Sequence, residues 1–258
     1  MTVERQAYNQ CMKHFLKWHA LALRCLAGVL VAFGASGAWA ADAPSVPDTL
    51  QQRIAACTTC HGVHGEGRPG SKFFPRLAGK PAAYLARQMQ DFQLGLRKYG
   101  PMEYAVRHLK PEYMREIADY FAAQEVAYAP SPAPAVSAEV LRRGETLVTH
   151  GDAQLRVPAC AACHGTDLVG VEPSTPALVG LPYDYISSQL GSWRTHTRAT
   201  VQPDCMALVA SRLRESDITA VAAWLASRQM PAQTRPQPAG SVRPPLECGV
   251  LRDAGAGA

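Results

Sequence analysis

Apolar side chains recur every three to four residues in segments that begin at Pro81, Pro111, Pro182 and Ser216. This spacing places them on one face of a helix, and proline suits a first helical turn, where its missing N–H is not needed. Gly95 marks the expected end of the first of these helices, and Ser216 is the expected cap of the last. Because no run of alternating polar and apolar residues indicates strands, the pattern predicts an all-α fold.

The same elements occur twice, just over one hundred residues apart. The sequence CTTCHG at 57–62 recurs as CAACHG at 160–165, and PRLAG at 75–79 recurs as PALVG at 176–180. Further matches follow in the same order as far as the last helix of each copy. The chain therefore contains an internal duplication of a whole domain, since this period is too long for a solenoid repeat.

Proline-rich segments indicate where the parts of the chain meet. The stretch AYAPSPAPAVS at 127–137 contains three prolines and favours an extended spacer. We therefore place a first repeat at 41–131 and a second repeat at 132–230. Residues 231–258 form a Pro-rich C-terminal tail, for which an irregular structure is expected.

The first forty residues have the pattern of a signal peptide. Lys13, Lys17 and Arg24 precede an apolar stretch at 26–33, and the sequence AWA then ends at Ala40. We expect cleavage after Ala40 and export to the periplasm. An uncleaved membrane anchor is the alternative, although the apolar stretch is short for a spanning helix.

Composition narrows the function classes. The chain has 258 residues, of which 47% are hydrophobic and 18% are charged, as in ordinary globular proteins. Without residues 1–40, 22 basic residues remain against 20 acidic ones. Nearly balanced charge without a basic run gives no support for nucleic-acid binding.

Each repeat contains the sequence Cys-x-x-Cys-His, which is the attachment signature of c-type haem. Two thiols at this spacing add across the two vinyl groups of a porphyrin, and the adjacent imidazole binds the iron. A zinc ribbon places its two cysteine pairs about 15–20 residues apart, and a thioredoxin-like pair expects a βαβ unit. The sequence therefore predicts two covalently bound haem c groups, attached through Cys57, Cys60, Cys160 and Cys163, with His61 and His164 as iron ligands.

The second axial ligand of each iron is expected to be methionine. Met102 lies 41 residues after His61, and Met206 lies 42 residues after His164. Each precedes the last helix of its repeat, where a loop would bring the sulfur to the second face of the haem. Most methionines are core residues, but Met89 and Met114 fall within predicted helices and have no counterpart in the second repeat. The matched spacing favours Met102 and Met206.

These motifs resemble those of the dihaem cytochrome c4 family, in which two class I cytochrome c domains stand in tandem. Each such domain is a small helical bundle around one covalently bound haem. The resemblance rests on CTTCHG with FPRLAGKPAAYLARQMQDFQLGLR, and on PACAACHG with PALVGLPYDYISSQLGSWR, and covers residues 50–228. It implies the same haem attachment and the same axial ligands as those given above.

The resemblance also implies a function. Proteins of this family carry single electrons in the periplasm, within a respiratory chain, and are not enzymes. Redox partners would be a terminal oxidase, a quinol-oxidising complex or a dehydrogenase, and any association with a membrane would come through them. Two alternatives stay open: a cytochrome subunit of a dehydrogenase complex, and a dihaem enzyme such as a peroxidase or thiosulfate dehydrogenase. Matched methionines argue against a peroxidase, which needs one iron without its sulfur ligand.

Some features depart from the family pattern. The second repeat has a full leading helix with Gly144 placed for a close helix contact, whereas the leading helix of the first repeat must be short. The tail is additional. Because the remaining cysteines of an exported chain usually pair, we predict a disulfide between Cys205 and Cys248. Cys205 as an iron ligand is the minority alternative.

Several polar groups are candidates for contacts to the haems or to partners. The carbonyl groups of Pro75 and Pro176 are candidates to orient the histidines. Four lysines lie in the first repeat and none in the second, which predicts a more cationic docking face on the first. The candidates for pairing with haem propionates are Arg76, Arg97 and Arg194.

Overall fold

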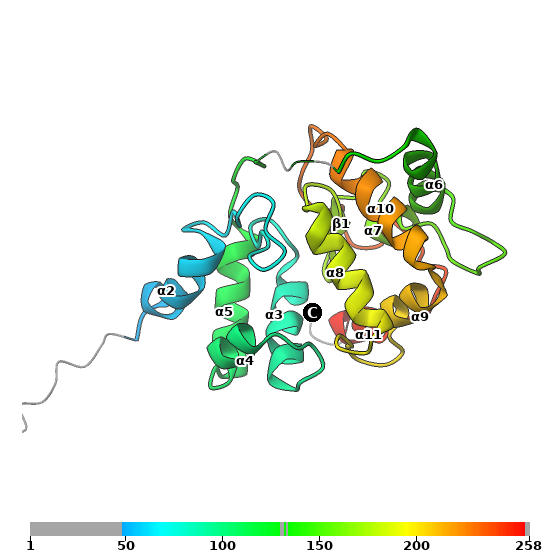
Figure 1. Cartoon of the computed structure of the whole chain (residues 1–258). Helices are drawn as coiled ribbons and strands as arrows, with labels where there is room; N and C mark the ends of the chain where they lie inside the picture. The colour runs from blue at the N-terminus through cyan, green and yellow to red at the C-terminus, as the bar shows by residue number, and fades with distance from the viewer. Residues whose placement is uncertain (1–47, 130–131, 133, 256–258) are drawn as a thin grey trace, which may run out of the picture. The chain divides into compact units, whose positions relative to one another are not determined.

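A computed structural model describes residues 48–129, 132 and 134–255 (Figure 1). The predicted signal peptide and its cleavage site after Ala40 lie outside the described residues. Among the residues described, no helix has both the length and the apolar character needed to cross a membrane.

Four helices make up the first repeat: α2 (Leu50–His61), α3 (Ala82–Gln93), α4 (Gly100–Val106) and α5 (Pro111–Ala122). As the sequence predicts, α3 follows Pro81 and α5 begins at Pro111. Gly95 follows α3 with a φ of 67°, a left-handed conformation that favours glycine. The buried faces of α3 and α5 form the core, which includes Leu85, Met89, Phe92, Met114, Ile117 and Phe121.

The second repeat has the same order of long helices and one small hairpin. Its elements are α6 (Ala138–Thr149), α7 (Ala161–His164), β1 (Gly170–Val171), β2 (Thr175–Pro176), α8 (Tyr183–Arg194), α9 (Cys205–Arg212) and α10 (Glu215–Ser227). The two-residue strands β1 and β2 pair antiparallel, with Val171 opposite Thr175. The all-α prediction is confirmed apart from this short hairpin.

The cap of α10 differs from the prediction. The N-cap is Arg214 and not Ser216, because Asp217 accepts a hydrogen bond from the backbone N–H of Arg214 at 3.1 Å. A carboxylate near a helix N-terminus satisfies an N–H that has no partner within the helix. The helix therefore begins before the serine.

The two repeats differ in how they reach the Cys-x-x-Cys-His sequence. In the first repeat the leading segment and the motif share one continuous helix, α2. In the second repeat, α6 and α7 are separate, and residues 150–160 connect them. The leading part of the first repeat is therefore short, as predicted, and ends directly in the motif.

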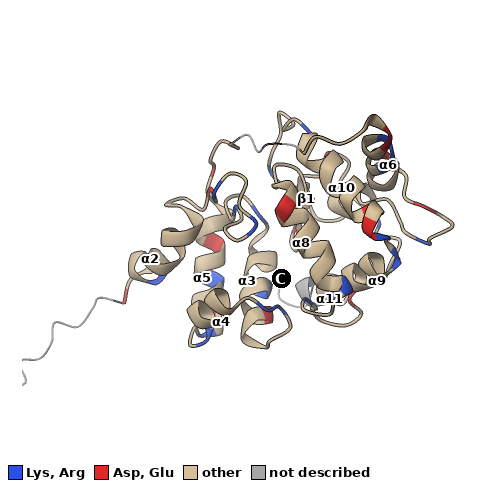
Figure 2. Cartoon of the chain, in the orientation of Figure 1, with Lys and Arg blue, Asp and Glu red and all other residues tan. Residues whose placement is uncertain are grey.

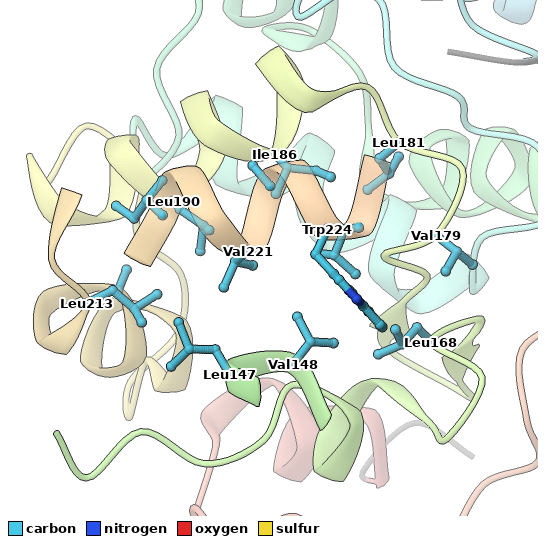
Figure 3. Close-up of a cluster of buried hydrophobic side chains, with 14 of the residues drawn as sticks. Leu147, Val148, Leu168, Val179, Leu181, Ile186, Leu190, Leu213, Val221 and Trp224 are labelled. Atoms are coloured by element: carbon cyan, nitrogen blue, oxygen red, sulfur yellow. The ribbon is translucent and has the colours of Figure 1, made fainter. Parts of the chain in front are cut away.

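Helix α6 packs closely against α10 in the second repeat. A Cβ atom on Gly144 would lie 2.1 Å from the carbonyl oxygen of Ala220 and 2.7 Å from Cβ of Trp224. Figure 3 shows Leu147 and Val148 of α6 pointing toward the side chains of α10. The glycine thus has the close-contact role that the sequence predicts.

The tail is more ordered than expected. Gln237 forms a parallel bridge with Val171, next to the hairpin. Farther along the tail lies α11 (Gly249–Gly255), a helix that was not predicted from the sequence. A disulfide with an S–S distance of 1.97 Å joins Cys205 of α9 to Cys248.

Candidate functional site

Each Cys-x-x-Cys-His sequence forms a helical turn that ends at a glycine. The two cysteines of each pair are three residues apart, in α2 for the first pair and at the N-cap and third residue of α7 for the second, so both thiols lie on one side of the helix. The next residue is Gly62 or Gly165, with φ values of 88° and 86°. Such positive φ values turn the backbone sharply after the histidine. The four thiols, those of Cys57, Cys60, Cys160 and Cys163, are free.

The histidines that follow the cysteine pairs are buried and held in the same way. Nδ1 of His61 lies 2.8 Å from the carbonyl oxygen of Pro75, and Nδ1 of His164 lies 2.8 Å from that of Pro176. A carbonyl can only accept, so Nδ1 carries the proton and Nε2 keeps its lone pair for a metal. Burial lowers the pKa of both imidazoles despite these hydrogen bonds, which favours the neutral ligand form.

The sequence pattern predicted that the two candidate methionines would lie in loops. In the structure, both lie in short helices. Met102 is the third residue of α4, and Met206 is the second residue of α9. Met102 packs against the same core as Cys57, and Met206 against the same core as Cys160. By contrast, Met89 and Met114 are buried in the core of the first repeat.

A cavity of about 430 Å³ lies beside the second motif. Cys160, Cys163, His164 and Met206 all line it, and its size is that of a small-molecule or cofactor site. Figure 3 shows several of the apolar side chains around it, and the apolar walls include Leu147, Leu190, Leu213, Val221 and Leu225.

The donor set and the cavity fit a covalently attached haem. Two thiols would serve for thioether bonds, one imidazole and one thioether sulfur could bind the iron, and the walls of the cavity are largely apolar. Within the described part of the chain, no group of three His, Cys, Asp or Glu side chains is placed to hold a bare metal ion.

A short backbone bridge joins the two repeats through equivalent segments. Arg97 and Arg198 occupy matching positions in the two copies and pair as an antiparallel bridge. The backbone N–H of Lys98 donates to the carbonyl of Thr197 at 3.1 Å, and that of Ala199 donates to the carbonyl of Leu96 at 2.6 Å. The two repeats are thus joined through equivalent segments.

The side chains of these arginines share the same acceptors. Arg97 donates to Oε1 of Gln88 at 3.0 Å and to Oε1 of Gln189 at 2.9 Å. Arg198 donates to the same two oxygens, at 2.8 Å and 2.6 Å. Burial, with the nearby charge of Arg97, lowers the pKa of Arg198. The acceptors are neutral amides, and the buried carboxylate of Asp91 interacts favourably with both arginines.

The cavity is lined by charged side chains from both repeats. Arg198 and the buried Lys80 both line it together with His164. Asp91 lines it as well, and its Oδ2 accepts a hydrogen bond from Oγ1 of Thr200 at 2.9 Å. The carboxylate-bearing edge of a haem would find complementary charge here.

The three arginines that the sequence suggested as partners of haem propionates differ in their contacts and exposure. Arg76 is buried, but it donates to the backbone carbonyl groups of Ala78 and Ala127 at 3.1 Å. Arg194 is exposed. Sequence reasoning identified Arg97 but missed Arg198. The repeat itself contained the signal, because Arg198 is the internal counterpart of Arg97.

Known proteins are similar to this chain in sequence. Residues 51–127 match the cytochrome c family. A protein of Thiomonas intermedia (strain K12) named thiosulfate dehydrogenase electron acceptor is 33% identical over 219 residues, which are 85% of this chain and 95% of that protein. Cytochrome c4 of Stutzerimonas stutzeri is 32% identical over 220 residues, which cover 78% of this chain and 97% of the relative.

Two solved structures are similar in fold and sequence. Reduced recombinant cytochrome c4 from Pseudomonas stutzeri superposes with a TM-score of 0.58 and 29% identity, over 70% of this chain and 97% of that one. Thiosulfate dehydrogenase (TsdBA) from Marichromatium purpuratum gives a TM-score of 0.59 and 34% identity. That match covers 67% of this chain and 36% of the longer chain.

Proposed function

Because this chain belongs to the cytochrome c4 family of electron carriers, with two tandem class I cytochrome c domains and two covalently bound haem c groups, we propose that it passes single electrons between redox proteins of the periplasm. It is an electron-transfer protein and not an enzyme. The proposal covers the residues of the two sites, the limits of the domains, the compartment and the partners.

The proposed ligand set is the same in both repeats. Each pair of cysteines forms the thioether bonds, the following histidine is one axial ligand, and Met102 or Met206 is the other. The observation that carries this assignment is the repeated 2.8 Å contact between a histidine Nδ1 and a proline carbonyl oxygen. An imidazole held in this way directs Nε2 toward a metal and keeps its orientation during the reaction.

When bound, haem c supplies a reversible one-electron change at its iron. The chain's own residues control the access of water to this site and its reduction potential. The apolar walls of the cavity exclude water, and a methionine sulfur at the sixth position raises the reduction potential. Arg198 and Lys80 line this cavity, and their positive charge would offset the negative charge of haem carboxylates.

The proposed domains are the first repeat at 41–131 and the second repeat at 132–230. Two separate apolar clusters support this division, one of them drawn from α2 to α5 and the other from the second repeat. We assign residues 1–40 to a signal peptide on the basis of their sequence pattern, and therefore place the protein in the periplasm.

A thiosulfate-oxidising dehydrogenase is the proposed electron donor, and a terminal oxidase or another respiratory complex is the proposed acceptor. Support comes from the relative named thiosulfate dehydrogenase electron acceptor, which aligns over almost its whole length. To test the donor, thiosulfate dehydrogenase and thiosulfate are mixed with the oxidised chain, and haem reduction is followed by absorbance. Reduction that requires both the enzyme and thiosulfate is expected. Its absence would contradict the choice of donor.

The electron-carrier function is tested by a carbon monoxide difference spectrum of the fully reduced protein, with haem counted in the same sample. Two haems and no binding of carbon monoxide are expected, because both sulfur ligands stay in place. Stoichiometric binding at one haem would favour an enzyme with an open iron. Stable co-purification with a catalytic polypeptide would instead favour the role of a dehydrogenase subunit.

A further inference from the structure

The two repeats differ most in the loop that follows the haem-attachment motif. In the first repeat this loop spans 62–75 and contains Arg68, Lys72 and Phe73. In the second repeat it spans 165–176, where it has two acidic residues and no Lys or Arg. In each copy the loop runs from the motif to the proline whose carbonyl group holds the histidine. With Glu66 counted, the first loop has two basic residues and one acidic residue, so the two loops carry opposite net charge.

The 62–75 loop joins the two parts of the first repeat that carry its proposed iron ligands. Arg68 donates to the carbonyl oxygen of Thr59 in the motif at 3.3 Å and lies over the ring of Phe74. Phe73 stacks on Tyr99, with 5.6 Å between ring centroids, and Tyr99 is the N-cap of the helix that carries Met102.

Large apolar side chains of this loop remain open to solvent. Val63 is 64% exposed and Phe73 is 47% exposed. The loop tip also borders an open hollow of about 560 Å³ with Asp184 and two serines of α8. Exposed apolar residues beside Arg68 and Lys72 have the composition of a protein-docking patch.

The equivalent loop of the second repeat is hydrogen-bonded to the tail, although Asp167 and Glu172 of this loop stay exposed. The backbone N–H of Gln237 donates to the carbonyl of Gly170 at 2.9 Å, and that of Glu172 donates back to the carbonyl of Gln237 at 2.8 Å. The side chain of Gln237 donates to Oγ1 of Thr166 at 3.0 Å, two residues after His164. This part of the tail therefore lies against the attachment motif.

The tail also reaches the segment that carries Met206. The disulfide joins it to Cys205, the neighbour of that methionine. The backbone N–H of Gly249 donates to the carbonyl of Pro203 at 2.9 Å, and a Cβ atom on Gly249 would lie 2.5 Å from the carbonyl of Gln202. Leu246 and Leu251 of the tail line the cavity itself. The tail thus contacts both ligand-bearing segments of the second repeat.

Resting on the electron-carrier function proposed above, we propose that the tail caps the second haem site, and that partner proteins exchange electrons through the 62–75 loop of the first repeat. The partner that fits this loop is a redox protein whose docking face is acidic around an apolar centre. Charge supports the choice: the first repeat has 11 basic and 9 acidic residues, and the second has 8 and 9. Figure 2 shows acidic residues at the starts of α8 and α10.

The docking face is tested with oxidised plant plastocyanin, an acidic copper protein, as the probe. Its Cu(II) takes one electron from the reduced chain, one haem iron goes from Fe(II) to Fe(III), and no atoms move. We expect the double variant Arg68→Glu/Lys72→Glu to lower the second-order rate constant about ten-fold at low ionic strength, with the difference vanishing at high salt. The matched control on the second repeat, Arg142→Glu/Arg194→Glu, should leave the rate unchanged. Equal slowing by both pairs, or no slowing by the first, would overturn the docking face.

The cap is tested with a small cationic oxidant, tris(phenanthroline)cobalt(III), which accepts one electron. A chain that ends at Met230 and carries Cys205→Ser should react faster than the full chain by about five-fold, because Leu246 and Leu251 of the tail would no longer cover the cavity that they line. If this shortened chain fails to fold, the full chain with Cys205→Ser and Cys248→Ser is measured instead. An unchanged rate in a variant that keeps its two-haem spectrum would overturn the cap.

A measurement on the unaltered chain needs no variant. Hydrogen–deuterium exchange with and without plastocyanin should show new protection at 62–75 and none at 165–176. Protection at 165–176 would place the partner on the second repeat and overturn the proposal. Failure of the electron-carrier function would be recognised separately, because chemical reduction would then not yield two haems closed to carbon monoxide.

Discussion

Asp217 on α10 accepts a hydrogen bond from Nε of Arg143 on α6 at 2.8 Å, within the closest helix contact of the second repeat. Arg143 also contacts Asp152 at 2.9 Å. Burial alone would raise the pKa of Asp217, but hydrogen bonds from Arg214 and Arg143 lower it to about 2. One carboxylate therefore links the helix start at Arg214 to the neighbouring helix.

The hydrogen bonds between Asp217 and its arginine partners predict how the free energy of unfolding depends on pH. A carboxylate with a lowered pKa stabilises the fold above its ordinary pKa, near 4, and loses that contribution as the pH falls toward 2. We expect Asp217→Asn to lower the free energy of unfolding at pH 7 by about 2 kcal/mol and to flatten its dependence between about pH 4 and 2. Urea unfolding followed by circular dichroism measures both effects. Exposed Asp167→Asn is the control, and an equal loss in both variants would contradict the prediction.

Two helical glycines predict opposite responses to alanine. Gly144→Ala places a methyl group 2.1 Å from the carbonyl oxygen of Ala220, so the helices must separate. We expect a loss of about 2 kcal/mol in the free energy of unfolding. At Gly191 in α8, no atom lies within 4 Å of an added Cβ. There, alanine should stabilise by about 0.5–1 kcal/mol. Thermal unfolding of both variants shows whether helix packing decides if alanine stabilises or destabilises the fold.

Removal of a sulfur ligand should open one iron. We expect reduced Met102→Ala and Met206→Ala each to bind one carbon monoxide per chain, and the double variant to bind two, because alanine cannot replace the ligand. Met114→Leu is the matched control, since Met114 is a buried core residue of the first repeat. Carbon monoxide titration followed by absorbance gives the stoichiometry. Binding in the control, or none in the alanine variants, would reject the ligand assignment.

The positive charge of Arg198 should tune a reduction potential. A nearby cation favours the reduced iron, which has one positive charge fewer, so Arg198→Met should lower the potential of at least one haem. Exposed Arg142→Met is the control for a general change of charge. Spectroelectrochemical titration of both variants gives the potentials. A rise in Arg198→Met, or the same shift in the control, would contradict the role assigned to this side chain.

The helices were predictable because their signals are local. Pro111 and Gly95 set helix ends through their own backbone preferences, and the spacing of apolar residues set the buried faces. The start of α10 was misplaced because a later residue, Asp217, satisfies the backbone of Arg214. The carboxylate of Asp217 forms that cap, whereas a serine hydroxyl is the group that usually signals a helix start in a sequence.

The features that were missed depend on contacts between distant parts of the chain. Helix α11 lies at the end of a segment held by a disulfide and by the carbonyl of Pro203, neither of which leaves a periodic pattern. Arg198 acquires its role only where the two repeats meet, where it shares Gln88 and Gln189 with Arg97. Within the second repeat Arg198 contacts Gln189 and Trp193, but the sequence signals it only through its match to Arg97.

The disulfide between Cys205 and Cys248 also constrains how the protein matures. Six cysteines follow residue 40, and four of them must stay reduced until haem is attached. A chain is made from its N-terminus, so both attachment motifs are complete before Cys205 appears and well before Cys248. The bond that fastens the tail therefore cannot close until nearly the whole chain has been synthesised. The order of residues in the chain thus makes the haem-attachment thiols available before the one pair of cysteines that must be oxidised.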